Sequence, residues 1–172
     1  MKKALLYLLP LILLFGCASN SKSSDSAGKS ASSCAAPSKT YNNAKLDNFL
    51  QTSYKVCTDL QEAQELLAEA NDFIADPVLY AQKKGAQGIA KVKSQFKEEL
   101  KNMVVSIAVD VIKKAGFTLQ SSGDATNAAK DLPGMDKLKA VKDVKAAISN
   151  LKGAAETAPQ VVDEMKTLLS QL

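Results

Sequence analysis

The chain has 172 residues and a formal net charge of +4; 46% of its residues are hydrophobic and only 5% are aromatic. It contains no His and no Arg, so it lacks the commonest general base, the commonest metal ligand and the planar cation that binds phosphate at two points. This composition argues against an enzyme, a cofactor or metal site and a nucleic-acid-binding protein. It favours one all-α domain with tails.

Residues 1–16 have the organisation of a secretory signal peptide. Lys2 and Lys3 precede a short apolar run that Pro10 interrupts. A helix needs about 20 apolar residues to cross a bilayer, and this run is shorter. We therefore expect residues 1–16 to be cleaved. Loss of the two lysines would leave a formal charge of +2, which is too small to imply an anionic partner.

Leu14, Phe15, Gly16 and Cys17 close this segment, and they resemble the lipobox of bacterial lipoproteins. In that class a Leu stands three positions before the Cys and a small residue directly before it. Phe15 departs from the Ala, Ser or Thr that is usual at its position. The resemblance covers the signal alone. It implies that Cys17 is acylated, becomes the first residue of the processed chain and holds the protein to membrane lipid, because several acyl chains bind stably where one does not.

The residue after the cysteine bears on localisation in this class, where an Asp retains the protein at the inner membrane. Here the residue is Ala18. The resemblance therefore implies a place on the outer membrane, facing the periplasm, in a host with two membranes. In a host with one membrane it implies display on the outer face of the cell.

Residues 17–40 carry the lipidation site and then mostly small polar side chains without apolar periodicity. This composition predicts a flexible, disordered tether. Residues 19–40 would span roughly 25 Å root-mean-square. The sequence thus predicts three parts: the signal at 1–16, the tether at 17–40 and a helical domain at 41–172.

Cys34 and Cys57 remain once Cys17 is acylated, and an even number of cysteines in an exported protein suggests a disulfide. A helix that starts at Tyr41 places Cys57 about 24 Å along its axis, and the segment from Cys34 to Tyr41 extends roughly 23 Å. The bond is thus feasible only if the tether runs back along this helix. The alternative is a free Cys34 and a packed Cys57.

Regular apolar spacing begins at Leu46 and predicts a first long helix that ends at Asp76, where Asp76 and Pro77 restart the chain. Its core-facing positions recur every three or four residues, as in a coiled coil. They are Leu46, Phe49, Ser53, Val56, Leu60, Ala63, Leu67, Ala70 and Ile74. The opposite face carries Glu62, Glu65, Glu69, Asp72 and Asp76, which we interpret as a solvated face. The alternative is a docking strip for a basic partner or for divalent cations, although carboxylates spread over four turns do not converge on one ion.

A second long helix is expected to end at Gly116. Near its start, Gly85 and Gly88 either allow close helix contact, which we favour, or mark a loosened turn. Its Lys93, Lys97 and Lys101 form a basic stripe that would suit contact with lipid headgroups. Opposite charge on the two long segments, −5 over residues 41–76 and +5 over 77–116, favours their antiparallel pairing. We also expect Asp110 to pair with Lys113 or Lys114.

Two shorter helices complete the expected fold, an irregular antiparallel bundle of about four helices. Residues 117–132 lack strong periodicity, which predicts a loop with at most one helical turn. The third helix would run from Pro133 to Gly153 with Leu138 facing inward, and the fourth would begin near Thr157 and Pro159.

Three functions fit this architecture. The first is a membrane-anchored envelope lipoprotein that acts as a non-enzymatic interaction or assembly module for a protein partner, an architectural analogy with small helical lipoproteins such as the pilotins. The second is a carrier or sensor of a small apolar ligand in the bundle core. The third, a hydrolase, ranks last because the sequence contains no catalytic motif.

Overall fold

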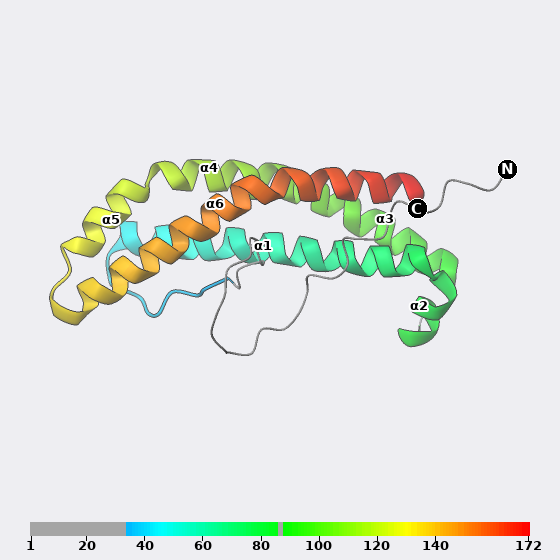
Figure 1. The fold of residues 1–172 in the computed structure, drawn as a ribbon, viewed down its shortest axis with the longest axis horizontal. Coiled ribbons are helices and arrows are strands. Elements are labelled where there is room, and N and C mark those ends of the chain that lie inside the picture. The colour runs from blue at the N-terminus through cyan, green and yellow to red at the C-terminus, as the bar shows by residue number, and fades with distance from the viewer. Residues whose placement is uncertain (1–33, 86–87) are drawn as a thin grey trace, which may run out of the picture. The chain divides into compact units, whose positions relative to one another are not determined.

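The computed structural model describes residues 34–85 and 88–172. Over these ranges the protein is helical and has no β-strand, which confirms the all-α class. The lipobox and Cys17 lie outside the described residues. The elements are α1 (Ala44–Ala75), α2 (Pro77–Lys83), α3 (Ile89–Ser106), the π-helix η1 (Ile107–Val111), α4 (Ile112–Gln120), α5 (Ser122–Lys130) and α6 (Gly134–Gln171) (Figure 1).

The predicted apolar seam of α1 is confirmed. From Leu46 to Ala70 all eight seam positions are buried, including the polar Ser53. The helix begins where the Asn43 side chain accepts a hydrogen bond from the backbone N–H of Leu46, at 3.2 Å. This cap satisfies one of the unpaired amides of the first turn.

The predicted break after α1 is also confirmed. Asp76 Oδ1 accepts a hydrogen bond from the Leu79 N–H at 2.9 Å, and Pro77 occupies the first position of α2. The predicted role of Gly85 and Gly88 is wrong. Both have positive φ, +62° and +104°, and a Cβ at either would meet no atom within 4 Å. These glycines supply the backbone conformation at which α2 ends and α3 begins, not a close helix contact.

The second long helix continues past its expected end at Gly116. The segments α3, η1 and α4 follow one another without a break to Gln120, so Gly116 lies inside α4. Ile107, Val111 and Ala115 are all completely buried and recur every four residues. In an α-helix each such step rotates the buried side by about 40°. The wider π-turn removes part of this rotation and keeps the three side chains on the core.

The C-terminal third differs most from the prediction. The expected loop contains α5, and the two expected short helices are one helix of 38 residues, α6, with Gly153 and Pro159 in its interior. Buried Leu151, Ala154 and Ala158 bracket these breakers. Packing of that face stabilises the helix where intrinsic propensity does not. Leu138 is 65% exposed, so its predicted inward position is wrong.

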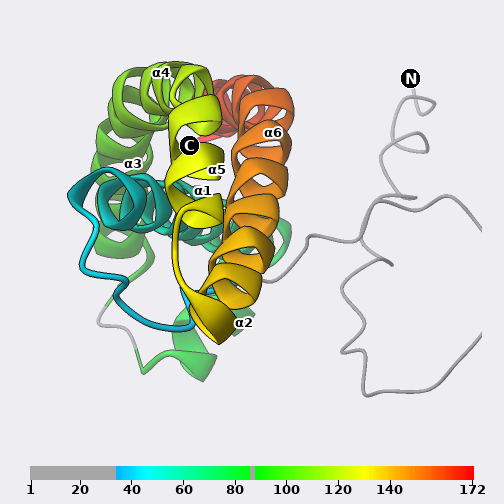
Figure 2. The ribbon, with the colours of Figure 1, turned by 90° about the vertical axis from the view of Figure 1, so that its left-hand side faces the viewer.

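The elements α3, η1 and α4 form one continuous rod, here called the α3–α4 rod. The core lies between α1, this rod and α6. Figure 2 shows α3 and α4 on one side and α6 on the other, with α5 in front. The Ser53 hydroxyl donates to the Ala147 carbonyl at 2.8 Å and links α1 to α6. Fully buried side chains fill the space between the helices: Leu46, Val56, Leu100, Ile107, Leu151 and Met165. Among the described helices none is both long enough and apolar enough to span a membrane.

Residues 34–43, here called the strap, pack against the helices, so the helical unit begins at Cys34 and not at the expected residue 41. Cys34 and Cys57 form a disulfide with 5.7 Å between their Cα atoms. The chain runs back along α1 from this bond, as the sequence required of a bonded pair. Ala35 and Ala36 lie over the seam between α1 and α6, beside Leu50 and Ala147.

The other end of the strap binds α6 through polar contacts. Asp143 Oδ2 accepts hydrogen bonds from the Ser38 N–H at 2.9 Å, the Ser38 hydroxyl at 2.7 Å and the Tyr41 hydroxyl at 2.8 Å. Lys39 forms an ion pair with Asp136 at 2.6 Å. Tyr41 is buried, and its burial is the main cause that raises the pKa of its phenol above 10.0.

Candidate functional site

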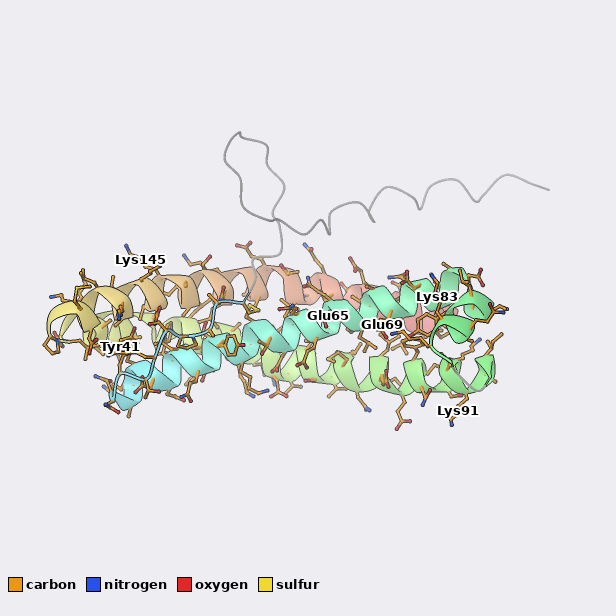
Figure 3. The ribbon with its side chains drawn as sticks, turned by 90° about the horizontal axis from the view of Figure 1, so that it is seen from below. Tyr41, Glu65, Glu69, Lys83, Lys91 and Lys145 are labelled. Atoms are coloured by element: carbon orange, nitrogen blue, oxygen red, sulfur yellow. A yellow bond between two sulfur atoms is a disulfide. The ribbon has the colours of Figure 1, made fainter. Side chains whose placement is uncertain are left out.

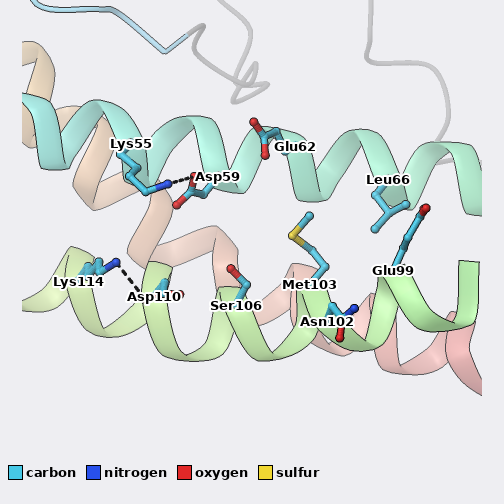
Figure 4. A pocket seen from close by; sticks show the side chains of 10 residues that line it. All are labelled: Lys55, Asp59, Glu62, Leu66, Glu99, Asn102, Met103, Ser106, Asp110 and Lys114. Atoms are coloured by element: carbon cyan, nitrogen blue, oxygen red, sulfur yellow. Dashed lines mark hydrogen bonds and ion pairs between the residues drawn. The ribbon is translucent and has the colours of Figure 1, made fainter.

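The candidate site is an open groove of about 560 Å³ between α1 and the α3–α4 rod (Figure 4). Both walls are helical, so the groove follows two rigid elements. α1 supplies Lys55, Asp59, Glu62 and Leu66, and the opposite wall supplies Glu99, Asn102, Met103, Ser106, Asp110 and Lys114.

The apolar part of the groove consists of Leu66 from α1 and Met103 from α3. Both side chains are partly buried and pack against the core. Figure 4 shows them extending toward each other from the two ribbons. An unbranched Met adapts its shape to a bound surface, so this floor suits an apolar side chain of a partner.

One end of the groove carries an ion pair on each wall. Lys55 and Asp59 are 3.0 Å apart on α1, and Lys114 and Asp110 are 2.9 Å apart on the opposite wall. The second pair confirms the expected pairing of Asp110. The hydrogen bond to Asp59 raises the pKa of Lys55. Both pairs join residues four apart in one helix, so each contributes only about 0.3–0.5 kcal/mol to stability. They are therefore available to exchange partners with a bound surface.

Glu62 and Glu99 line the other part of the groove, and no ion pair joins either to a lysine within the described ranges. The groove therefore has a negative balance around its apolar floor. Residues 34–85 and 88–172 contain no group of three or more Cys, Asp or Glu placed to hold a metal ion.

The π-helix determines what the second wall presents to the groove. It adds a wider turn between α3 and α4, with Ser106 directly before it and Asp110 inside it. Short π-segments inside α-helices are frequent at functional sites. Here the π-turn keeps Ile107 and Val111 in the core while Ser106 and Asp110 line the groove.

The predicted acidic face of α1 serves several purposes. Glu69 accepts hydrogen bonds from Lys84 at 2.9 Å and from the Tyr80 hydroxyl at 3.2 Å, and the contact with Lys84 lowers the pKa of its carboxyl. These bonds tie α2 to α1. Tyr80 also contacts the ring of Phe73, at 5.7 Å between centroids. Only Glu62 of the predicted stripe lines the groove, and all five side chains of the stripe are exposed, as expected of a solvated face.

The structure does not join the predicted site residues into one site. Cys17 lies outside the described residues, and Cys34 and Cys57 form the disulfide of the strap. Sequence reasoning missed the groove because its lining residues come from helices that are distant along the chain. The available signals were Asp110 beside an apolar face and the four-residue spacing from Ile107 to Ala115.

The described part of the chain thus belongs to the all-α class. It carries an open groove that is apolar at its floor and charged at its rim. No protein-family model, curated protein or solved structure matches the chain.

Proposed function

We propose that this chain is a lipid-anchored bacterial envelope lipoprotein whose helical domain docks another envelope protein in the groove between α1 and the α3–α4 rod. The open groove is the observation that carries the docking part. The lipobox at Leu14 to Cys17 supports the anchoring part. In a host with two membranes the proposed place is the outer membrane, facing the periplasm.

The chemistry of the groove suits protein docking. An apolar centre with a polar rim is the common anatomy of a protein interface, and here Leu66 and Met103 form the centre while Glu62 and Glu99 belong to the rim. Two parallel walls suit an amphipathic helix as the occupant. The unpaired acids favour an occupant whose polar side carries lysine or arginine.

The same features rank the alternatives lower. A carrier of an apolar ligand needs space inside the core, where large side chains such as Leu100, Leu151 and Met165 are fully buried. The small pocket between the strap, α1 and α6 has a volume of about 20 Å³, which is room for about one water molecule. A hydrolase needs an activated nucleophile, and the sequence contains no His to serve as its base.

Anchoring is tested by fractionation of cells that express the Cys17→Ser variant. The expected result is release from the membrane fraction, because the acceptor thiol is gone. Cys34→Ser is the matched control and should remain with the membrane. A Cys17→Ser protein that stays in the membrane fraction after a high-salt wash, which removes electrostatically bound protein, would contradict acyl anchoring.

Docking is tested by photo-crosslinking in cells. A crosslinking amino acid at Asn102, on the groove wall, is expected to capture one defined envelope protein. The same amino acid at Glu164, on the exposed side of α6, serves as the control. Adding Glu62→Lys and Glu99→Lys should abolish the capture at Asn102. Equal capture from both positions, or capture that survives the charge reversal, would count against the groove.

A further inference from the structure

The exposed side of the first half of α6 carries a basic stripe with an apolar end. Its members are spaced by three or four residues and therefore share one side of the helix. They are Met135, Leu138, Lys142, Lys145, Ser149 and Lys152, all exposed; we call this set the α6 stripe. Met135 is 67% and Leu138 65% exposed, which is unusual for two neighbouring large apolar side chains. Glu156 follows Lys152 by one turn and ends the basic run.

The acids of this part of α6 do not oppose the lysines of the stripe, because each directly follows a stripe residue and therefore lies about 100° around the helix. Residues 134–153 contain five lysines and two acids, Asp136 and Asp143. The strap engages both acids, Asp136 through Lys39 and Asp143 through Ser38 and Tyr41. Within the described ranges no carboxylate forms an ion pair with Lys142, Lys145 or Lys152. The stripe thus presents unneutralised positive charge to solvent.

The covalent route to Cys17 leaves the helical unit on this side of the molecule. Cys34 is fixed to Cys57 and the strap lies over the seam between α1 and α6. Sixteen residues separate Cys17 from Cys34, and a chain of that length reaches at most about 55 Å. An acylated Cys17 would therefore allow the α6 stripe to reach the lipid surface.

We propose that the α6 stripe binds the anionic lipid surface to which Cys17 anchors the protein, with Met135 and Leu138 entering the headgroup region and the lysines contacting lipid phosphates. The inference rests on the proposed lipid anchor. Lysines beside an apolar edge are the pattern of helices that lie on anionic membranes. The groove would then remain open for a partner while the bundle lies on the bilayer.

A second basic stripe, Lys93, Lys97 and Lys101 on α3, is the internal competitor. Glu98 and Glu99 lie within the same run of the chain, and Lys97 is partly buried. Figure 3 shows Lys145 and Lys91, the latter also on α3, on opposite sides of the helices. The α3 stripe is also followed by exposed apolar side chains, Val105 and Val109, so the two stripes differ in the acids within the α3 run and not in apolar neighbours. The α3 stripe therefore supplies a control of equal charge.

The sequence contains no Trp, so one introduced Trp reports its own surroundings. We would place Leu138→Trp in the full lipidated chain, reconstituted into vesicles of phosphatidylethanolamine and phosphatidylglycerol with brominated acyl chains. Val105→Trp is the control. Val105 is 62% exposed on α3. It lies 14 residues, about four helical turns, after Lys91 and therefore on the same side of α3 as Lys91. Bromine should quench the fluorescence at position 138 and leave position 105 unquenched.

Charge is tested in the same vesicles with Lys142→Gln, Lys145→Gln and Lys152→Gln combined in the Leu138→Trp chain. Quenching should fall to the level at position 105, whereas Lys93→Gln, Lys97→Gln and Lys101→Gln should leave it unchanged. In a chain with Cys17→Ser, the three α6 changes should weaken vesicle binding on the order of 100-fold, from about 1 kcal/mol for each lysine.

The outcomes separate the two proposals. A lipidated chain that does not float with vesicles overturns the anchor, whatever the fluorescence shows. A chain that floats, with position 138 unquenched or with equal quenching at position 105, overturns the lipid-binding role of the stripe alone. Crosslinking of position 138 to an acidic protein in cells, with no quenching in vesicles, would instead assign the stripe to a protein partner.

Discussion

Three polar side chains are buried in the described core, those of Ser53, Thr118 and Asn150. Ser53 donates to Ala147 across the α1–α6 contact, and Thr118 is also buried. Asn150 is only 8% exposed, and its Nδ2 has no hydrogen-bond partner among the described residues. A buried donor without a partner costs about 1–3 kcal/mol. The unpaired amide of Asn150 therefore lowers the free energy of unfolding of the helical unit.

Asn150→Leu should raise the free energy of unfolding by about 1 kcal/mol, because it removes the unpaired amide and keeps a similar volume. Urea denaturation followed by circular dichroism measures the change. Ser149→Leu, at the exposed neighbouring position, should leave it within about 0.5 kcal/mol. A less stable Asn150→Leu protein would mean that the amide has a partner in solution.

Tyr41 should make the unfolding free energy fall at alkaline pH. Burial and the neighbouring Asp143 raise the pKa of its phenol above 10.0, so the folded state binds the proton more tightly than the unfolded state. This stability is fully present below pH 10 and is lost as the pH rises through the folded pKa. Tyr80, whose pKa burial also raises, adds to the same fall.

Tyr41→Phe should reduce this alkaline loss. It should also lower stability at neutral pH by about 1 kcal/mol, because Asp143 loses one donor. Tyr54→Phe, at an exposed position of α1, is the matched control. Urea denaturation at pH 8 and pH 11 compares the variants, and an unchanged alkaline slope in Tyr41→Phe would refute the assignment.

At the scale of the elements, the sequence predicts α1 well and α6 poorly. The seam of α1 repeats every three or four residues with large side chains, and its ends carry Asn43 and Asp76 as caps, so pattern and capping agree. In α6 the inward positions include Ala140, Ala147, Ala154 and Ala158. Alanine gives a weak periodic signal, and Gly153 with Pro159 gives a strong local signal for a break. Tertiary packing decides against that break, and a single sequence does not reveal such packing.

The continuity of α6 predicts that Gly153→Ala is stabilising. Gly153 is helical, exposed and has no atom within 4 Å of an added Cβ, so Ala should raise the free energy of unfolding by about 0.5–1 kcal/mol. Gly134→Ala is the contrasting control, since its φ of +54° is unfavourable for any L side chain, and it should destabilise. Thermal unfolding measures both changes. If residues 134–171 formed two short helices, Gly153 would be the C-cap of the first, and Gly153→Ala would destabilise the protein.

At the scale of the whole molecule, the sequence established the helical class, and the possibility of the Cys34–Cys57 bond. It did not establish the groove, which needs the relative placement of α1 and the α3–α4 rod. Nor did it predict the strap, because the residues around Ser38 have no periodic pattern and are held by two acids of α6. Contacts between segments about a hundred residues apart leave no local trace in a single sequence.

Replacing Cys34 and Cys57 with serine should lower the free energy of unfolding by about 3 kcal/mol, from the entropy of a closed loop of this size; the cysteines are 23 residues apart. Urea denaturation of the Cys34→Ser, Cys57→Ser chain measures the loss. Reduction of the native chain with a thiol should reproduce it, whereas reduction of the double variant should have no further effect. Equal stability with and without the bond would refute this account.

The position of the disulfide also determines how a mechanical load would cross the protein. Cys57 lies within α1, two residues before Asp59 and five before Glu62 of the groove. Tension between a lipid-held Cys17 and a partner in the groove would enter α1 at Cys57 and leave it within a few helical turns. The covalent bond would carry that tension past the hydrogen bonds of Ser38 and Tyr41 and past α6, so these noncovalent contacts would bear none of the load.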